Sequence, residues 1–484
     1  MPGFSLDVDY HAIAPELVLA GTILVVATLD LFLRVERKWW AMPVSFIGLA
    51  AALGATLSLL GSTPRESFGG TYVIDDFAVL FKTFFLVVGL VVLMISLRYF
   101  RDGRYFQGEY YFLLLSSFLG MLTISSSRDL LMLFISLELV SAPAFIIAGL
   151  RKRDPRSNEG AMKFFLIGIL SAAVMLYGMS LIYGATGVLT LEGIAERLGG
   201  ANRSLALAGV LFVIVGFGFK ISSVPFHFWA PDTYEGSPIP VAAFLSVASK
   251  AAGFAGLLQL MFLGFAPTAA DWTPIFAVLA VLTMTIGNLI ALQQTQVVRL
   301  LAYSSIAQAG YMMVPFALIG GGVAVEEKAF AAAVLYLLIY GVMNLGAFAV
   351  VVGVSRESPG ALISDFAGMG RRNPLMAVAM LMFLLSLAGL PPLAGFWAKF
   401  FIFDAAITAG QAWLAVAIVV NSVISLFYYI SIAKQMFFVE GVEERPFRAP
   451  VLVTGVVALA AAAVLAVGFF PDLFATFPPG ATLP

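Results

Sequence analysis

The stretch GFKISSVPFHFWAPD, residues 218–232, places a lysine and a proline within one long apolar segment. The apolar residues 205–224 are long enough to cross ~30 Å of hydrocarbon as a helix, and Lys220 lies among them. Proline removes a backbone donor and clashes with the preceding turn, so we expect the helix to kink or open between Ser222 and Pro225. The stretch therefore predicts a membrane helix that is broken beside a buried charge.

A second stretch, LAGLPPLAGFWAKFF at residues 387–401, carries the same kind of interruption. Its two prolines come just before Lys399, and each of the two breaks is followed by a Phe-Trp pair. A proline kink or an aromatic pair alone is common in membrane helices, but here a lysine lies close to both breaks. Paired interruptions in corresponding halves indicate an internal repeat of the transporter type, with the functional path at the breaks.

The composition is that of a polytopic membrane protein with almost no room for an extramembrane domain. Of 484 residues, 61% are hydrophobic and only 11% are charged, with a mean hydropathy of +0.99, whereas soluble chains carry about 25% charged residues. A net charge of −1 argues against a nucleic-acid partner. The absence of cysteine excludes disulfides and iron–sulfur ligation, and the two histidines argue against a metal or haem centre. No phosphate-binding glycine loop or nucleophile–base pattern appears, so we expect no cofactor in this chain.

Long apolar runs separated by short polar connections predict about fourteen membrane-spanning helices. Their approximate cores are 15–33, 41–60, 77–97, 110–126, 130–149, 161–184, 205–224, 240–263, 274–292, 298–318, 329–353, 374–390 continuing through 395–408, 412–437 and 451–469. The odd-numbered loops then hold sixteen Lys and Arg residues and the even-numbered loops five, while both terminal tails hold none. This asymmetry predicts that the odd-numbered loops face the cytoplasm and that both termini lie on the outer side.

Five charged residues lie inside the predicted spans: Glu138, Lys163, Lys220, Lys250 and Lys399. Each costs at least ~2.5–3.5 kcal/mol at membrane depth, so residues of this kind usually line a polar or watery interior. Burial favours a neutral amine, whereas a nearby carboxylate favours the ammonium form, so one lysine can bind or release a proton as its counterion moves. The five residues therefore predict a path along which protons move.

The expected depth of these residues differs. Glu138 lies ~14 Å and ~20 Å from the two ends of its helix, near mid-membrane, and Lys250 is similarly deep. Lys163 lies only about five residues inside the cytoplasmic end, so it fits either the path or a side chain that snorkels to the interface. Lys82, near the outer end of its helix, is expected to snorkel, and Arg299 and Asp404 lie near helix ends as solvated anchors.

A few polar residues near these charges are candidate proton relays. His227 follows the first break, and imidazole titrates near neutral pH, yet a histidine beside Phe and Trp fits a packed, hydrogen-bonded role equally well. Tyr303 and Ser305 on the tenth span and Tyr336 on the eleventh could order water in the second half of the chain. Polar residues also join membrane helices to one another, and both interpretations stay open.

Five segments within roughly residues 120–410 are distinctive: LMLFISLELVSAPAFIIAGL, EGAMKFFLIGILSAAVMLYG, FKISSVPFHFWAPDTYEGSPIPVAAFLSVASKAAG, VVRLLAYSSIAQAGYM and LAGLPPLAGFWAKF. They resemble the antiporter-like membrane subunits of respiratory complex I, the bacterial NADH-quinone oxidoreductase. The L-E-L-V-S-A-P and S-V-A-S-K patterns look like the N type of this family rather than its L and M types.

The resemblance implies an all-α fold with two inverted five-helix repeats, helices four to eight and nine to thirteen, each built around one broken helix. The corresponding divisions are 1–108 for helices one to three, 109–265 and 266–438 for the two repeats, and 439–484 for helix fourteen and the tail.

The resemblance also implies roles for the buried charges. Glu138 matches the fifth-helix glutamate and Lys220 the seventh-helix lysine, Lys163 and Lys250 match connecting basic residues, and Lys399 matches the twelfth-helix lysine near the exit. The halves are not symmetric, because Lys220 precedes its Phe-Trp pair by eight residues whereas Lys399 follows its own by three. The second half also lacks an obvious counterpart to Glu138.

On this resemblance we expect a proton-translocating subunit of the membrane arm that carries no redox centre. NADH, FMN, iron–sulfur clusters and quinone would belong to partner subunits: an M-type antiporter-like subunit, the small K-, J- and A-type subunits and the peripheral arm. The expected location is the bacterial cytoplasmic (inner) membrane, with many passes and both termini on the periplasmic side. Two alternatives are a subunit of a free-standing multi-subunit cation/proton antiporter and a structural membrane spacer.

Overall fold

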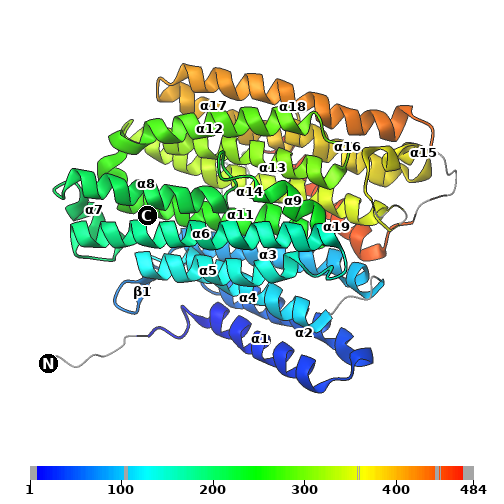
Figure 1. The fold of residues 1–484 in the computed structure, drawn as a ribbon, viewed down its shortest axis with the longest axis horizontal. Helices are drawn as coiled ribbons and strands as arrows, with labels where there is room; N and C mark the ends of the chain where they lie inside the picture. The colour runs from blue at the N-terminus through cyan, green and yellow to red at the C-terminus, as the bar shows by residue number, and fades with distance from the viewer. Residues whose placement is uncertain are drawn as a thin grey trace.

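The computed structural model describes residues 8–102, 107–356, 358, 360–441, 446 and 448–471. Both chain ends and two of the predicted cytoplasmic arginines, Arg104 and Arg445, lie outside the described residues. The described chain is almost wholly helical, as the sequence predicts, and most helices run along one common direction (Figure 1). The first two helices lie at one edge of the bundle and α18 lies at the opposite edge.

The first half of the chain contains these elements: α1 (Ala14–Phe32), η1 (Val35–Trp40), α2 (Ala41–Leu57), β1 (Arg65–Ser67), β2 (Tyr72–Ile74), α3 (Asp76–Asp102), α4 (Gln107–Ser125), α5 (Leu130–Ala148), α6 (Pro155–Thr186), α7 (Leu191–Leu198), α8 (Arg203–Lys220), α9 (Trp229–Gly236), α10 (Ile239–Phe244), η2 (Leu245–Ser249), α11 (Lys250–Gln259) and η3 (Leu260–Gly264). η2 and η3 are π-helical turns: η2 interrupts the helical segment Ile239–Gly264, and η3 ends it.

The second half contains η4 (Ala266–Thr268), α12 (Ala269–Ala291), α13 (Val297–Met313), η5 (Val314–Leu318), α14 (Val323–Val354), η6 (Ile363–Phe366), α15 (Met369–Arg372), α16 (Pro374–Ala388), α17 (Ala394–Thr408), α18 (Ala412–Phe438) and α19 (Val451–Phe469). The last helix, α19, packs against α14, α16 and α17 and also touches α3 of the first half.

Eleven helices in the described residues are long and apolar enough to cross a membrane, and α16 is a shorter apolar helix. The expected class, an all-α polytopic membrane protein, is therefore confirmed. The expected number of fourteen spans, the two inverted repeats and the four divisions of the chain stay predictions.

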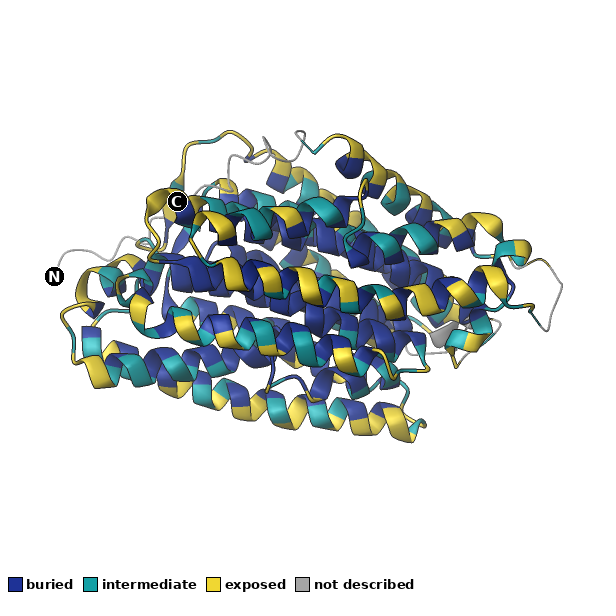
Figure 2. Cartoon of the chain, turned by 90° about the horizontal axis from the view of Figure 1, so that it is seen from above, coloured by how far each residue is buried: buried dark blue, intermediate teal, exposed yellow. Residues whose placement is uncertain are grey.

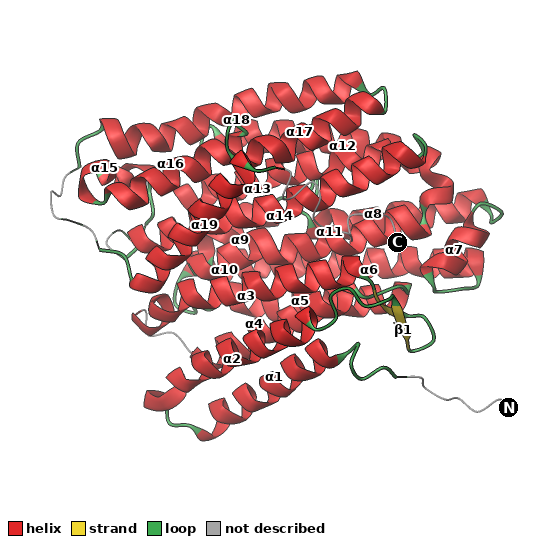
Figure 3. Cartoon of the chain, turned by 180° about the vertical axis from the view of Figure 1, so that it is seen from behind, coloured by secondary structure: helices red, strands yellow, loops and turns green. Residues whose placement is uncertain are grey.

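The chain has two distinct ends along the bundle direction. The hairpin end carries the antiparallel β1–β2 pair and α7, and α15 lies at the opposite end (Figure 3). The short hairpin was not predicted, because its strands have only three residues each. The loops at the hairpin end are even-numbered loops, which are expected on the outer side of the membrane; that orientation stays a prediction.

Helix ends follow from local chemistry. Asp129 begins α5 by accepting hydrogen bonds from the backbone of Leu131 (2.8 Å) and Met132 (3.2 Å). Pro374 occupies the first turn of α16, and Gly389 ends that helix with φ = +90°, a conformation that favours glycine. These signals fix where the helix before the second break starts and stops.

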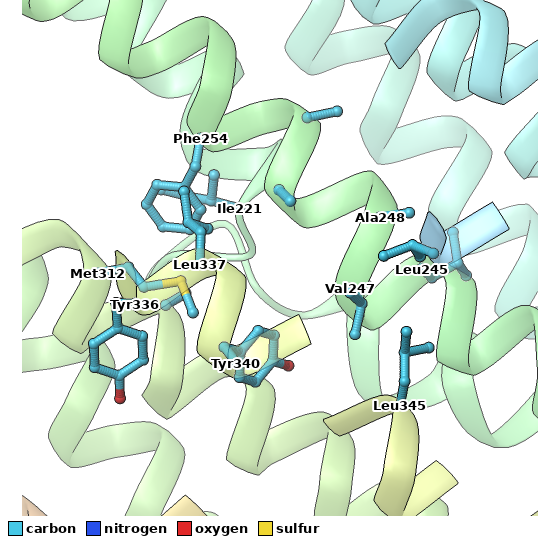
Figure 4. Close-up of a cluster of buried hydrophobic side chains, with 14 of the residues drawn as sticks. Ile221, Leu245, Val247, Ala248, Phe254, Met312, Tyr336, Leu337, Tyr340 and Leu345 are labelled. Carbon is cyan, nitrogen blue, oxygen red and sulfur yellow. The ribbon is translucent and has the colours of Figure 1, made fainter. Parts of the chain in front are cut away.

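The most deeply buried segments are Ile239–Gly264 and α14, which form the centre of the bundle (Figure 2). Figure 4 shows one cluster of buried side chains, which come from η2, α11, α13 and α14 and include Ile221 of the first break. Tyr336 and Tyr340 of α14 belong to the cluster, and both are fully buried. The central segment Ile239–Gly264 also carries Lys250, so the centre of the apolar core holds a charge.

The expectation that Lys82 snorkels is wrong. Its side chain is completely buried, and its ammonium group lies 2.6 Å from Glu16 Oε1 and donates to the Tyr72 hydroxyl at 2.6 Å. Tyr72 in turn donates to Glu16 at 3.0 Å. The ion pair joins α1 to α3 and to the hairpin, so Lys82 is compensated within the protein rather than by water.

Lys82→Ala should destabilise the subunit by roughly 3–5 kcal/mol, because it leaves the Glu16 carboxylate buried without a cation. The double variant Glu16→Gln, Lys82→Met removes both charges at similar volume and should stay close to the wild type. Thermal unfolding of the purified complex, followed by the amount of this subunit that stays assembled, measures both. A single variant as stable as the wild type would contradict the buried pair.

Candidate functional site

The first break lies between α8 and α9 and frees backbone groups at membrane depth. α8 ends at Lys220, and Ile221–Phe228 are not helical. The bonds that satisfy the freed groups include those from Ser223 N to Gly218 O (2.8 Å), from Val224 N to Thr283 Oγ1 of α12 (3.0 Å) and from Trp229 Nε1 to Phe219 O (3.1 Å). The tryptophan that follows the proline therefore closes the break by binding a carbonyl of the preceding helix.

Four polar atoms around this break are buried and have no hydrogen-bond partner in the described residues. They are Ser222 Oγ, Ser223 Oγ, His227 Nδ1 and Tyr234 OH. Buried polar groups are nearly always hydrogen-bonded, and internal water commonly supplies the partner. The group therefore marks a place suited to water beside Lys220. His227 is almost fully buried and its ring lies 4.5 Å from that of Phe228, so its relay role stays a prediction.

Glu138 and Lys220 interact without forming a direct ion pair. Lys220 is 7% exposed, and Glu138 is the charged residue that attracts it by Coulomb force. One carboxylate oxygen of Glu138 is buried and has no hydrogen-bond partner in the described part of the chain. The Lys220 ammonium lies 5.5 Å and 5.9 Å from the ring centres of Phe219 and Phe145. Because Glu138 and Lys220 are not in direct contact, each side chain is free to exchange partners.

Lys250 lies at the centre of the bundle and is bound to α13. Its residue is 1% exposed, and its ammonium donates to Ser305 O (2.7 Å) and Ser305 Oγ (3.0 Å). The π-helical turn η2 ends at the residue before it. π turns inside helices are frequent at functional sites, because they redirect side chains and free a carbonyl. The structure thus brings together two residues that the sequence placed on separate spans, Lys250 and Ser305.

The second break lies between α16 and α17 and uses different partners. Gly395 N donates to Ser386 Oγ (3.0 Å), whereas Trp397 Nε1 donates to Gly468 O of α19 (2.9 Å) rather than to its own break. Each break contains a cis X–Pro bond, Val224–Pro225 and Pro391–Pro392.

Lys399 belongs to α17 but reaches back to α16. Its ammonium donates to Ala388 O, the carbonyl of the last residue of α16, at 2.9 Å. Such carbonyls have no partner within the helix and carry the negative end of the helix dipole. Lys220 is the last residue of α8 and Lys399 caps the end of α16, so both lysines lie where the helix before a break ends. The sequence conceals this correspondence, because the spacing between the lysine and the Phe-Trp pair differs at the two breaks.

A buried hydrogen-bond network extends along α13 between Lys250 and Lys399. Ser304, next to Ser305, is 2.6 Å from the Tyr429 hydroxyl, and Gln308 donates to Tyr429 (3.3 Å) and to Leu387 O (3.0 Å). Tyr336 donates a short hydrogen bond to Gln308, so it belongs to the network. Tyr303 is only half-buried and has no side-chain hydrogen bond in the described residues. Sequence reasoning missed Tyr429, because tyrosine in an apolar helix carries no local signal.

Lys163 lies apart from the buried residues, in a charged cluster around α9. Its side chain is 42% exposed and binds Glu159 and Asp232, both at 2.6 Å. Arg299 of α13 binds the same Asp232 (2.7 Å) and Glu235 (2.8 Å). The cluster borders a cavity of about 250 Å³ and ties the helix after the first break to α6 and α13. The role of Lys163 on the path stays a prediction.

The described residues contain no group of three or more His, Asp or Glu side chains that could hold a metal ion. An apolar groove of about 360 Å³ lies between α16, α17 and α18, with Lys399 and Ser422 among its lining residues. Fold and site together define an all-α, multi-pass membrane protein with helices broken beside buried lysines.

A family model described as "NADH:quinone oxidoreductase/Mrp antiporter, TM" matches residues 127–425. The chain therefore belongs to the family of membrane subunits shared by NADH:quinone oxidoreductases and Mrp antiporters, and the resemblance drawn from its sequence is confirmed.

Full-length relatives are similar over nearly the whole chain. NADH-quinone oxidoreductase subunit N of Trichlorobacter lovleyi is 40% identical over 477 residues, which cover 97% of this chain and 96% of the relative. F(420)H(2) dehydrogenase subunit N of Methanosarcina mazei is 40% identical over 486 residues, covering 96% of each chain. A chain of respiratory complex I from Thermus thermophilus with bound aureothin superposes with a TM-score of 0.80 at 35% identity, covering 95% of this chain and 98% of that one.

Gly395→Ala should destabilise the second break, because a Cβ there would collide with the Ser386 carbonyl oxygen. The cost should be about 1–3 kcal/mol or more, since backbone cannot yield as a side chain can. Gly455→Ala on α19 is the matched control, because its Cβ would meet nothing within 4 Å. The melting temperature of the purified complex measures both; equal melting temperatures would mean that the close approach at Gly395 is not required.

Proposed function

We propose that this chain is an N-type membrane-arm subunit of an NADH:quinone oxidoreductase and that it moves protons outward across the membrane. The observation that carries the proposal is the series of buried lysines: Lys220, Lys250 and Lys399 lie on different helices, each almost fully buried, and a polar network along α13 lies between the last two. Burying three ammonium groups without ion pairs is costly. In a purely structural subunit such groups would only lower stability.

The relatives support the redox complex as the setting. Subunit N proteins of NADH-quinone and F(420)H(2) dehydrogenases match over more than nine-tenths of their length, and the similar solved chain comes from respiratory complex I. NADH oxidation and quinone reduction would take place in partner subunits, with FMN, iron–sulfur clusters and quinone bound there. Those partners would include an M-type antiporter-like subunit, the small K-, J- and A-type subunits and the peripheral arm.

The mechanism follows from the electrostatics of the first break. When Glu138 is ionised and close, it stabilises the Lys220 ammonium. When the charge of Glu138 moves away or is neutralised, that stabilisation is lost and Lys220 releases its proton. Polar atoms around Ser222 and Tyr234 suit the water that would take this proton towards Lys250. A change of charge on Lys250 would pass along the α13 network to Lys399. Coupling of this kind is a free energy shared between sites, so it works in both directions.

The outward direction rests on the proposed orientation in the inner membrane. With odd-numbered loops in the cytoplasm, the hairpin end and both termini would face the periplasm. The charged cluster of Lys163, Asp232 and Arg299 would then lie at the cytoplasmic end, where protons enter.

The two alternatives are less well supported. A free-standing cation/proton antiporter shares the family, but the relatives at 40% identity are named as subunits of dehydrogenases. A structural spacer would be expected to pair its buried charges, as Lys82 and Glu16 are paired, yet Lys250 and Lys399 have no ion pair within the described residues.

Lys220→Met and Glu138→Gln should each lower the number of protons moved per NADH oxidised, because each removes one member of the switching pair. Proton uptake by inverted membrane vesicles, with NADH oxidation recorded in parallel, measures this ratio. Lys434→Met changes an exposed lysine of α18 and is the control. Pumping and activity at wild-type levels in both variants would refute the proposal.

A further inference from the structure

Lys399 is a buried ammonium without a carboxylate. No acidic side chain of the described residues acts on it, and its one hydrogen bond is to Ala388 O. The end of a helix stabilises a nearby cation only modestly. The cost of holding the charge at membrane depth is larger, so a further stabilising group is expected.

The aromatic face of Tyr311 supplies such a group. The Lys399 ammonium lies 4.4 Å from the centre of the Tyr311 ring, compared with 5.5 Å and 5.9 Å for the two rings near Lys220. The negative face of an aromatic ring attracts a cation, and the attraction is stronger where water is excluded. Tyr311 is 1% exposed, so the contact is desolvated.

The Tyr311 ring is held in place from two other helices. Its hydroxyl lies 3.5 Å from Asn288 Nδ2 of α12, and Asn288 also donates to Asn421 O of α18 at 3.0 Å. Tyr428 donates to Asn288 Oδ1 at 2.9 Å. The ring is further stacked on Tyr336, with 6.4 Å between ring centres and 17° between their planes. The hydroxyl thus interacts with Asn288 of α12 and with Ser422 of α18, while the ring face meets Lys399.

We infer that the ring face of Tyr311 is the second-half counterpart of Glu138: a positioning group that holds Lys399 charged at the end of α16. The inference deepens the proposed function and rests on it. A ring face and a carboxylate differ in one chemical respect. Both stabilise an ammonium group over a neutral amine, but the ring cannot accept the proton. A proton that leaves Lys399 therefore cannot be trapped on its stabilising group, as it could be on a carboxylate, and must move on.

The test separates the ring from the hydroxyl. Tyr311→Phe keeps the ring and loses the contact with Asn288, whereas Tyr311→Leu removes the ring. Purified complex in liposomes, with protons moved per NADH oxidised as the readout, should show Tyr311→Phe near wild type and Tyr311→Leu lowered towards the ratio of Lys399→Met. Phe316→Leu is the matched control, because Phe316 is equally buried on the following turn and its ring partners are Phe254, Phe262 and Phe276.

Fluorinated phenylalanines placed at position 311 give a second measurement that leaves shape nearly unchanged. Fluorine withdraws charge from the ring face, so the ratio should fall stepwise from one to three fluorines. Tyr311→Leu at the wild-type ratio, Tyr311→Phe as low as Tyr311→Leu, or no trend with fluorine would each overturn the inference.

Lys399→Met distinguishes this inference from the proposed function. A wild-type ratio in Lys399→Met would mean that protons do not depend on this lysine, and the proposed path itself would fail. A low ratio in Lys399→Met together with a normal ratio in Tyr311→Leu would leave the path standing and reject the role of Tyr311 alone.

Discussion

An ammonium group inside a membrane must be stabilised by some group of the protein, and the rest of this structure follows from that constraint. Lys82 meets it completely, through a close ion pair with Glu16 and a hydrogen bond to Tyr72. Lys220, Lys250 and Lys399 are stabilised only in part. Lys220 has a carboxylate in Coulomb range but no contact, and Lys250 has a carbonyl and a hydroxyl. A fully compensated lysine is fixed, whereas a partly compensated one can change its protonation when its surroundings change.

The two broken helices provide this partial compensation. A break ends a helix in mid-membrane, and a helix end exposes carbonyls that attract a cation. Lys399 uses such a carbonyl, while Lys220 is itself the last residue before its break. The tryptophan after each proline binds a different partner, Phe219 in one case and Gly468 of α19 in the other. The halves therefore share a plan without being interchangeable, in line with the unequal offsets in the sequence.

Much of the fold was predictable because membrane helices are recognised in the sequence as long apolar runs, and prolines indicate where these helices break. The cost of burial also singled out Lys220, Lys250 and Lys399 as residues deep in the protein. Residue counting gives depth along a helix but not the direction in which a side chain points. The sequence therefore left Lys163 open between the path and a side chain that snorkels to the interface, and the distant partner of Lys82 was missed. The π turn before Lys250 and the bond between Ser304 and Tyr429 could not be foreseen, because they depend on packing between helices.

The central claim is that protons pass from the first break through Lys250 to Lys399. The measurement that tests it most directly is a map of the complete complex, recorded by electron cryo-microscopy at a resolution that shows individual water molecules. If protons take this route, ordered water is bonded to Ser222, Ser223 and Tyr234 and continues without interruption to Lys250 and along α13 to Lys399. A dry, apolar gap between any two of these lysines, present in every state of the working complex, would contradict it.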